Sequence, residues 1–192
     1  GCGTAIGMRY PVVEIVTAAL SGLVAWRFGF GLEAAGALLL TWSLVALTVF
    51  DLDHQLLPDS FTLPVLWLGL FFALQGAEFT DLRSAVIGAM AGYLSLWSIY
   101  HLFKLVTGKE GMGFGDFKLL GALGAWLGWQ MLPVIIILSA LVGAGVGIAM
   151  IVLAGRDSQR PMPFGPFLAA AGYIAMLWGP ELVAAYRQLA GF

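Results

Sequence analysis

Two aspartates at the ends of apolar segments are the residues whose chemistry stands out in this sequence. Asp51 directly follows the apolar run 38–50, and Asp116 directly precedes the apolar run 117–129. Ionisable residues at such positions are costly to place and usually functional. Two carboxylates brought close together cannot both ionise easily, so one of them keeps a proton. Such a pair can hydrolyse a peptide bond, because the ionised member takes a proton from water while the protonated member donates to the carbonyl oxygen.

Structural roles are also open to these carboxylates. Asp is a common N-cap, and the helix dipole favours negative charge at a helix N-terminus, so Asp116 fits a cap as well as a catalytic acid. Asp51 comes at the end of a helical segment, where the dipole disfavours a carboxylate, and this favours a functional role. Asp53 is the alternative reactive residue. Asp59, after Pro58, is interpreted as the N-cap of the next helix.

The surroundings of the two aspartates supply candidate supporting residues. The glycines before Asp116 permit a close approach of a substrate strand, or form a flexible loop; they are Gly111, Gly113 and Gly115. Lys118 is close enough in sequence to Asp116 to lower its pKa. His54 is expected to make a hydrogen bond or contact substrate rather than bind metal, because metal sites need several clustered ligands. The sequence contains no HExxH or GxSxG motif.

The composition indicates a membrane protein. Hydrophobic residues make up 60% of the 192 residues and charged residues 10%, whereas a soluble domain carries roughly 25% charged residues. The net charge of −2 gives no sign of nucleic-acid binding. A membrane-spanning helix needs about 20 mostly apolar residues. Seven segments approach this length, and those at 61–76 and 117–129 are short enough to enter at an angle or only part way. The segments are 12–29, 32–50, 61–76, 84–104, 117–129, 132–154 and 164–179.

We therefore predict an all-α, polytopic membrane helix bundle with six to seven transmembrane helices, forming one domain over 1–192. Lys and Arg residues are retained on the cytoplasmic side of a membrane. If Arg9 is cytoplasmic, this side also holds Lys104, Lys109, Lys118, Arg156 and Arg160, against Arg27, Arg83 and Arg187 on the other. The polar loops 51–59 and 107–118 both fall on the cytoplasmic side, so Asp51 and Asp116 are expected at the same face.

Four segments in order resemble the bacterial type IV prepilin leader peptidase/N-methyltransferase family of GxGD membrane aspartyl proteases. They are RYPVVE (9–14), DLDHQLLPD (51–59), GKEGMGFGDFKLL (108–120) and PMPFGPFLAAAG (161–172). The resemblance implies a multi-pass protein of the bacterial inner membrane. It implies cleavage of the basic leader from prepilins and type II secretion pseudopilins at the cytoplasmic face, with no cofactor for proteolysis. Asp51 and Asp116 are then the catalytic pair, and Asp53 is supporting.

The same resemblance implies a second activity in the full-length protein. Many bacterial members also methylate the new amino terminus with S-adenosylmethionine, and they carry a zinc-binding region with two CxxC pairs before the RYPVVE segment. Here Cys2 is the one cysteine, interpreted as a remnant of the zinc site, with residues 1–11 the remnant of that region. We expect the chain to be part of a longer protein. Glu14 is left open between methyl-transfer support and helix capping.

Two alternatives remain at the level of sequence. Within the protease class, the alternative is an archaeal-type preflagellin peptidase. In a different class, a proton-coupled membrane transporter also uses intramembrane acids as proton relays. Transporters are usually built from inverted repeats with acids near the bilayer midplane, whereas here the acids are expected at one face and the sequence shows no clear repeat.

Overall fold

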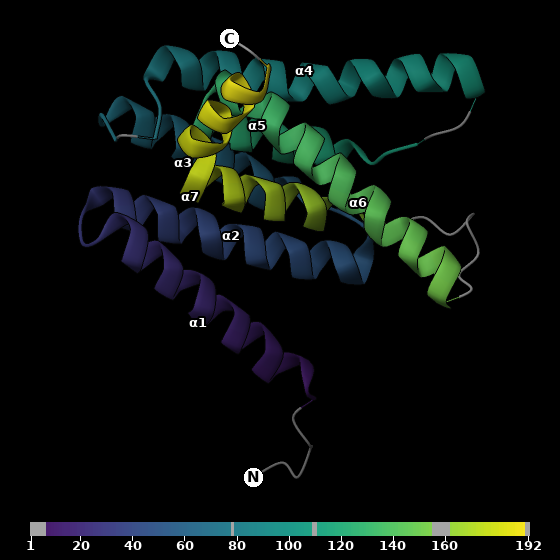
Figure 1. Ribbon diagram of the computed structural model, residues 1–192, viewed down its shortest axis with the longest axis horizontal. Helices are drawn as coiled ribbons and strands as arrows, with labels where there is room; N and C mark the ends of the chain where they lie inside the picture. Colours follow the sequence, from purple (N-terminus) through teal and green to yellow (C-terminus); the bar gives the residue numbers. More distant parts are fainter. Residues whose placement is uncertain (1–6, 78, 109–110, 155–161, 191–192) are drawn as a thin grey trace.

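The computed structural model describes residues 7–77, 79–108, 111–154 and 162–190, and in these ranges the chain is helical, with no strand (Figure 1). A short 3-10 turn, η1 (Trp129–Met131), joins the fifth and sixth helices. The predicted all-α helix bundle is confirmed. The α-helices are α1 (Arg9–Phe28), α2 (Leu32–His54), α3 (Asp59–Leu74), α4 (Leu82–Thr107), α5 (Phe114–Leu127), α6 (Leu132–Ala154) and α7 (Gly165–Ala190).

The helices differ in whether they are long enough to cross a membrane. Within the described part of the chain, five stretches are long and apolar enough to cross a membrane: α1, α2, α4, Trp129–Val152 and Gly165–Ala185. The other two helices, α3 with 16 residues and α5 with 14, are shorter than the roughly 20 residues that a span needs. These are the two segments that the sequence predicts to be short. Asp116 lies in α5 and therefore outside the five candidate spans.

The central element is α5, which contacts α3, α4 and α7 (Figure 1). From Asp116 to Leu127 every residue of α5 except Lys118 is buried. Because α5 is enclosed by other helices, its apolar side chains form the middle of the core and do not depend on lipid contact. Its first turn is therefore held at a fixed position, and Asp116 is part of that turn.

Glycines allow α4 and α5 to approach backbone to backbone. A Cβ atom added at Gly124 would lie 2.1 Å from the backbone oxygen of Gly88, and one added at Gly88 would lie 2.2 Å from the oxygen of Gly124. Small residues are typical where membrane helices approach this closely. Gly143 and Gly147 of α6 face the side chains of Phe167 and Met162. The two GxxxG patterns of the sequence, Gly124/Gly128 and Gly143/Gly147, therefore pack within the bundle.

Candidate active site

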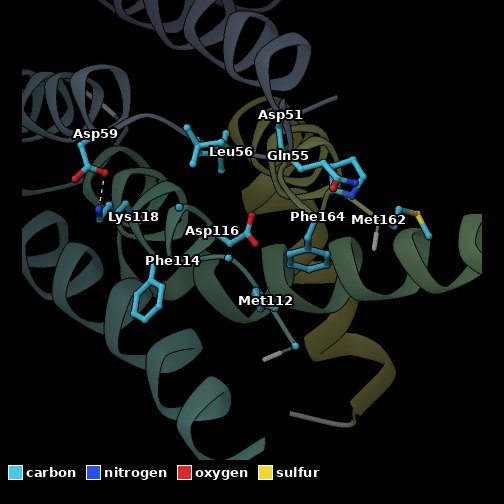
Figure 2. Close-up of a pocket in the computed structure, with 15 residues that line it drawn as sticks. Asp51, Gln55, Leu56, Asp59, Met112, Phe114, Asp116, Lys118, Met162 and Phe164 are labelled. Atoms are coloured by element: carbon cyan, nitrogen blue, oxygen red, sulfur yellow. Dashed lines mark hydrogen bonds and ion pairs between the residues drawn. The ribbon is translucent and has the colours of Figure 1, made fainter. Parts of the chain in front are cut away.

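Asp51 and Asp116 are brought to one cavity by helices that are far apart in the sequence. Asp51 lies in the last turn of α2 and Asp116 in the first turn of α5. Their residues are only 5% and 6% exposed. Both line a cavity of about 630 Å³, Asp51 from α2 and Asp116 from α5 (Figure 2). Burying two carboxylates in one cavity is unfavourable for folding, which favours a chemical role.

One contact of Asp51, a backbone hydrogen bond, stabilises its ionised form. The backbone N–H of Gly165 donates a hydrogen bond of 3.0 Å to Asp51 Oδ2. Gly165 is the first residue of α7, where backbone N–H groups have no partner within the helix and the helix dipole attracts negative charge. A Cβ atom at position 165 would lie 2.6 Å from Asp51 Oδ2. A glycine is therefore required for this contact at the present helix positions.

The surroundings of Asp116 favour its protonated form. Burial and then the negative charge of Asp51 raise the pKa of Asp116 to about 7, against the opposing effect of a backbone hydrogen bond with Gly113. The two carboxylates are thus close enough to influence each other's proton. One keeps a proton near neutral pH and the other has a hydrogen-bond donor for its charge. This is the division that an acid–base pair of carboxylates needs.

Lys118 lines the cavity but does not act on Asp116 as the sequence predicts. Its ammonium donates a hydrogen bond to Asp59 Oδ1, at the start of α3. The prediction that Lys118 lowers the pKa of Asp116 is wrong for this arrangement, because the Lys118 ammonium is paired with Asp59 and does not contribute to the pKa of Asp116. The interpretation of Asp59 as an N-cap is also wrong: Pro58 is the N-cap and Asp59 the first helical residue.

Asp53 and His54 do not line the cavity. Asp53 forms an ion pair of 2.5 Å with Arg9, which joins α1 to the end of α2. The His54 ring stacks on the ring of Phe50, with centroids 4.5 Å apart. This arrangement favours Asp51 over Asp53 as the partner of Asp116, and leaves Asp53 and His54 as candidates for a supporting role at the helix end.

Two groups at the site, the Leu57 side chain and the Gly165 N–H, cannot be recognised from the sequence alone. Leu57, only 6% exposed, lies between two helix starts: Cβ atoms added at Gly115 and Gly165 would lie 2.6 Å and 3.2 Å from its side chain. The Gly165 N–H is a backbone group. Helix α7 starts at Gly165, directly beside Asp51.

The glycines of the 111–115 loop differ in how tightly they are enclosed, and this gives a stability prediction. A Cβ atom at Gly115 would meet Leu57 Cβ at 2.6 Å, whereas one at Gly113 would meet only Asp116 Oδ2, at 3.8 Å. We expect Gly115→Ala to destabilise the protein by about 1–3 kcal/mol, as overpacking does, and the matched control Gly113→Ala to change stability far less. Thermal unfolding in detergent, followed by circular dichroism, measures both; equal Tm values for the two variants would contradict the packing described here.

One known protein family matches more than half of the chain. The model of the Type IV leader peptidase family matches residues 38–148, which include both aspartates. The chain belongs to this family. Curated relatives named "Prepilin leader peptidase/N-methyltransferase" are 59% identical over 191 residues in Pseudomonas aeruginosa and 60% identical over 186 residues in Aeromonas hydrophila. These alignments cover 100% and 97% of this chain but 66% and 64% of the relatives. No solved structure matches the chain.

The chain of this leader peptidase family member therefore spans about two thirds of the length of the curated relatives it matches. Cys2, the predicted remnant of a zinc site, lies outside the described residues. Among the residues that the structure describes, no group of three or more His, Cys, Asp and Glu side chains is arranged to hold a metal ion. The described residues thus do not fit a zinc site, and the mechanism below is derived from the two aspartates.

Proposed function

We propose that this chain is a membrane aspartic endopeptidase that removes leader peptides from prepilins and type II secretion pseudopilins. One observation carries the proposal: two buried carboxylates, Asp51 and Asp116, line one cavity, and the negative charge of Asp51 helps to raise the pKa of Asp116. Membership of the Type IV leader peptidase family supports it. So do the printed names of the relatives from Pseudomonas aeruginosa and Aeromonas hydrophila.

The mechanism assigns one role to each carboxylate. A water molecule between them loses a proton to ionised Asp51 as its oxygen attacks the carbonyl carbon of the scissile peptide. Protonated Asp116 donates its proton to the carbonyl oxygen, so the tetrahedral intermediate forms without a separated charge. The C–N bond then breaks, the amine leaving group takes the proton held by Asp51, and a hydroxyl proton returns to Asp116. The Gly165 N–H holds Asp51 in place throughout.

The cavity walls fit a peptide with an apolar residue beside the scissile bond. Apart from the charged groups, the lining is mostly apolar and glycine-rich; among its apolar side chains are Leu56, Met112, Phe114, Met162 and Phe164. An apolar side chain entering this space would gain about 25 cal/mol per Å² of surface that it buries. The family resemblance implies that prepilins are cleaved after a glycine and that a phenylalanine is usually exposed, and such a substrate matches this chemistry.

Location and further activities belong to the same proposal. We place the protein in the bacterial inner membrane as a single membrane-embedded domain over 1–192, with the cavity facing the cytoplasm, in accordance with the distribution of Lys and Arg. N-methylation with S-adenosylmethionine, and zinc binding, are assigned to the full-length protein. The names of the relatives favour a prepilin peptidase over a preflagellin peptidase. The position of both acids at helix ends favours a protease over a proton-coupled transporter.

The test is cleavage of a synthetic prepilin-like substrate, carrying a basic leader that ends in glycine, by this chain in liposomes. We expect mass spectrometry to show a single cut after the leader glycine. The full-length Pseudomonas aeruginosa relative, reconstituted in the same way, is the positive control. An intact substrate with this chain, under conditions where that relative cleaves it, would contradict the proposed function.

A further inference from the structure

At the edge of the cavity, apart from the Asp51–Asp116 pair, Lys118 and Asp59 form an ion pair (Figure 2). Their side chains keep 25% and 58% of their surface exposed. Ion pairs with this exposure contribute little to folding stability. The position of the pair on the cavity wall therefore points to a role in the site rather than in the fold.

We propose that Asp59 is a positioning residue that holds the Lys118 ammonium at the edge of the cavity and off the Asp116 carboxyl. Of the described residues that line the cavity, Lys118 is the one cation, and it shares the lining with the carboxylates of Asp51, Asp59 and Asp116. A lysine ammonium sits on a flexible four-carbon stem. If Asp59 loses its charge, the carboxylates left to Lys118 in this cavity are those of the proposed catalytic pair.

The consequence concerns the proton on Asp116. An ammonium close to a carboxyl favours the ionised form and lowers its pKa. In the present arrangement burial and Asp51 raise the pKa of Asp116, and Lys118 does not oppose them. The effect of Asp59 on catalysis rests on the proposed function, in which Asp116 must donate a proton. The effect of Asp59 on the pKa of Asp116 does not rest on it.

Among the residues that the structure describes, the other groups packed around Asp116 offer no competing cation at the cavity wall. From α2 comes Asp51, and from the start of α3 comes Asp59. From α4, the rings of Tyr93 and Tyr100 pack against Phe117, and Tyr100 also packs against Phe114. The Lys104 ammonium lies 5.7 Å from the centroid of the Tyr100 ring. The segment before α7 contributes Met162, Pro163 and Phe164, all uncharged. Of the described cations, Lys118 is thus the one whose position can change the charge next to Asp116.

The experiment follows the infrared carbonyl band of the protonated Asp116 carboxyl against pH in the reconstituted chain, with the band identified by its loss in Asp116→Asn. For the parent we expect a midpoint near pH 7, so the proton is present below this pH and lost above it. In Asp59→Asn we expect the midpoint to fall by about one pH unit or more. In Asp59→Asn combined with Lys118→Met, it should return to the parent value.

Two further variants sharpen the test. Lys118→Met alone should leave the midpoint where it is in the parent, since Lys118 is already held away; a raised midpoint in this variant would overturn the inference. Glu181→Gln is the matched control, because it removes an exposed carboxylate from the ion pair with Arg27, outside this cavity, and its midpoint should not move.

An unchanged midpoint in Asp59→Asn, or a lowered one that Lys118→Met fails to restore, would also overturn the inference. These titrations need no substrate, so they test the inference independently of the proposed function. If the proposed function fails, the titration midpoints will still shift as expected, but the protein will not cleave the substrate. Where cleavage occurs, the activity of Asp59→Asn should fall at a lower pH than that of the parent as the pH rises. Adding Lys118→Met to this variant should restore the activity at alkaline pH to that of the parent.

Discussion

Asp51→Asn and Asp116→Asn are each expected to reduce cleavage of a prepilin-like substrate by roughly 10²- to 10⁴-fold, the size of effect attributed to a positioned acid or base. Asparagine keeps the shape of the side chain but neither accepts a proton from water nor donates one as an acid. Single-turnover cleavage in liposomes gives the rate, and circular dichroism checks that each variant is folded. The double variant should be about as slow as either single variant, not slower by a second factor of this size. Residues that act as a unit have strongly non-additive effects on the rate.

The control for this result is Asp53→Asn, the same change two residues along α2. Asp53 pairs with Arg9 outside the cavity, and an exposed ion pair is worth about 0.2–1 kcal/mol. We therefore expect a loss of less than about tenfold in cleavage. If Asp53→Asn were inactive and Asp51→Asn active, the assignment of the reactive carboxylate on α2 would be reversed.

The helices were predictable because length and apolarity are properties of the sequence itself. Each segment of the sequence analysis corresponds to a helix, and the two expected to be short, at 61–76 and 117–129, are α3 and α5. What the sequence did not show is that α5 lies at the centre of the bundle. An apolar segment has the same appearance whether its neighbours are lipids or other helices, so burial against protein depends on tertiary contacts.

The site could be predicted where its chemistry is carried by charged side chains beside apolar segments. Asp51 and Asp116 stood out as charges beside apolar runs. The Gly165 N–H has no side-chain signal, and Leu57 is one apolar residue among many. The pairing of Lys118 with Asp59 joins positions 59 residues apart, so only the packing of α3 against α5 reveals it. Sequence proximity alone gave the wrong partner for Lys118.

The second large effect is expected at the contact between α4 and α5. Gly124→Ala places a methyl group 2.1 Å from the backbone oxygen of Gly88, and a backbone atom cannot rotate away as a side chain can. We expect a loss of about 3 kcal/mol, at the upper end of overpacking effects, and a fall in Tm of roughly 6–12 °C for a chain of this size. Thermal unfolding in detergent by circular dichroism measures the change.

The matched control is Gly22→Ala in α1, where an added Cβ atom has no neighbour within 4 Å. Alanine is favoured over glycine in a helix interior by about 1 kcal/mol, so this variant should keep or raise the Tm. A Gly124→Ala variant as stable as Gly22→Ala would mean that α4 and α5 are not in backbone contact. Since α5 carries Asp116 on its first turn, and α4 holds α5 in place, the same result would also remove the physical reason for the position of Asp116 opposite Asp51.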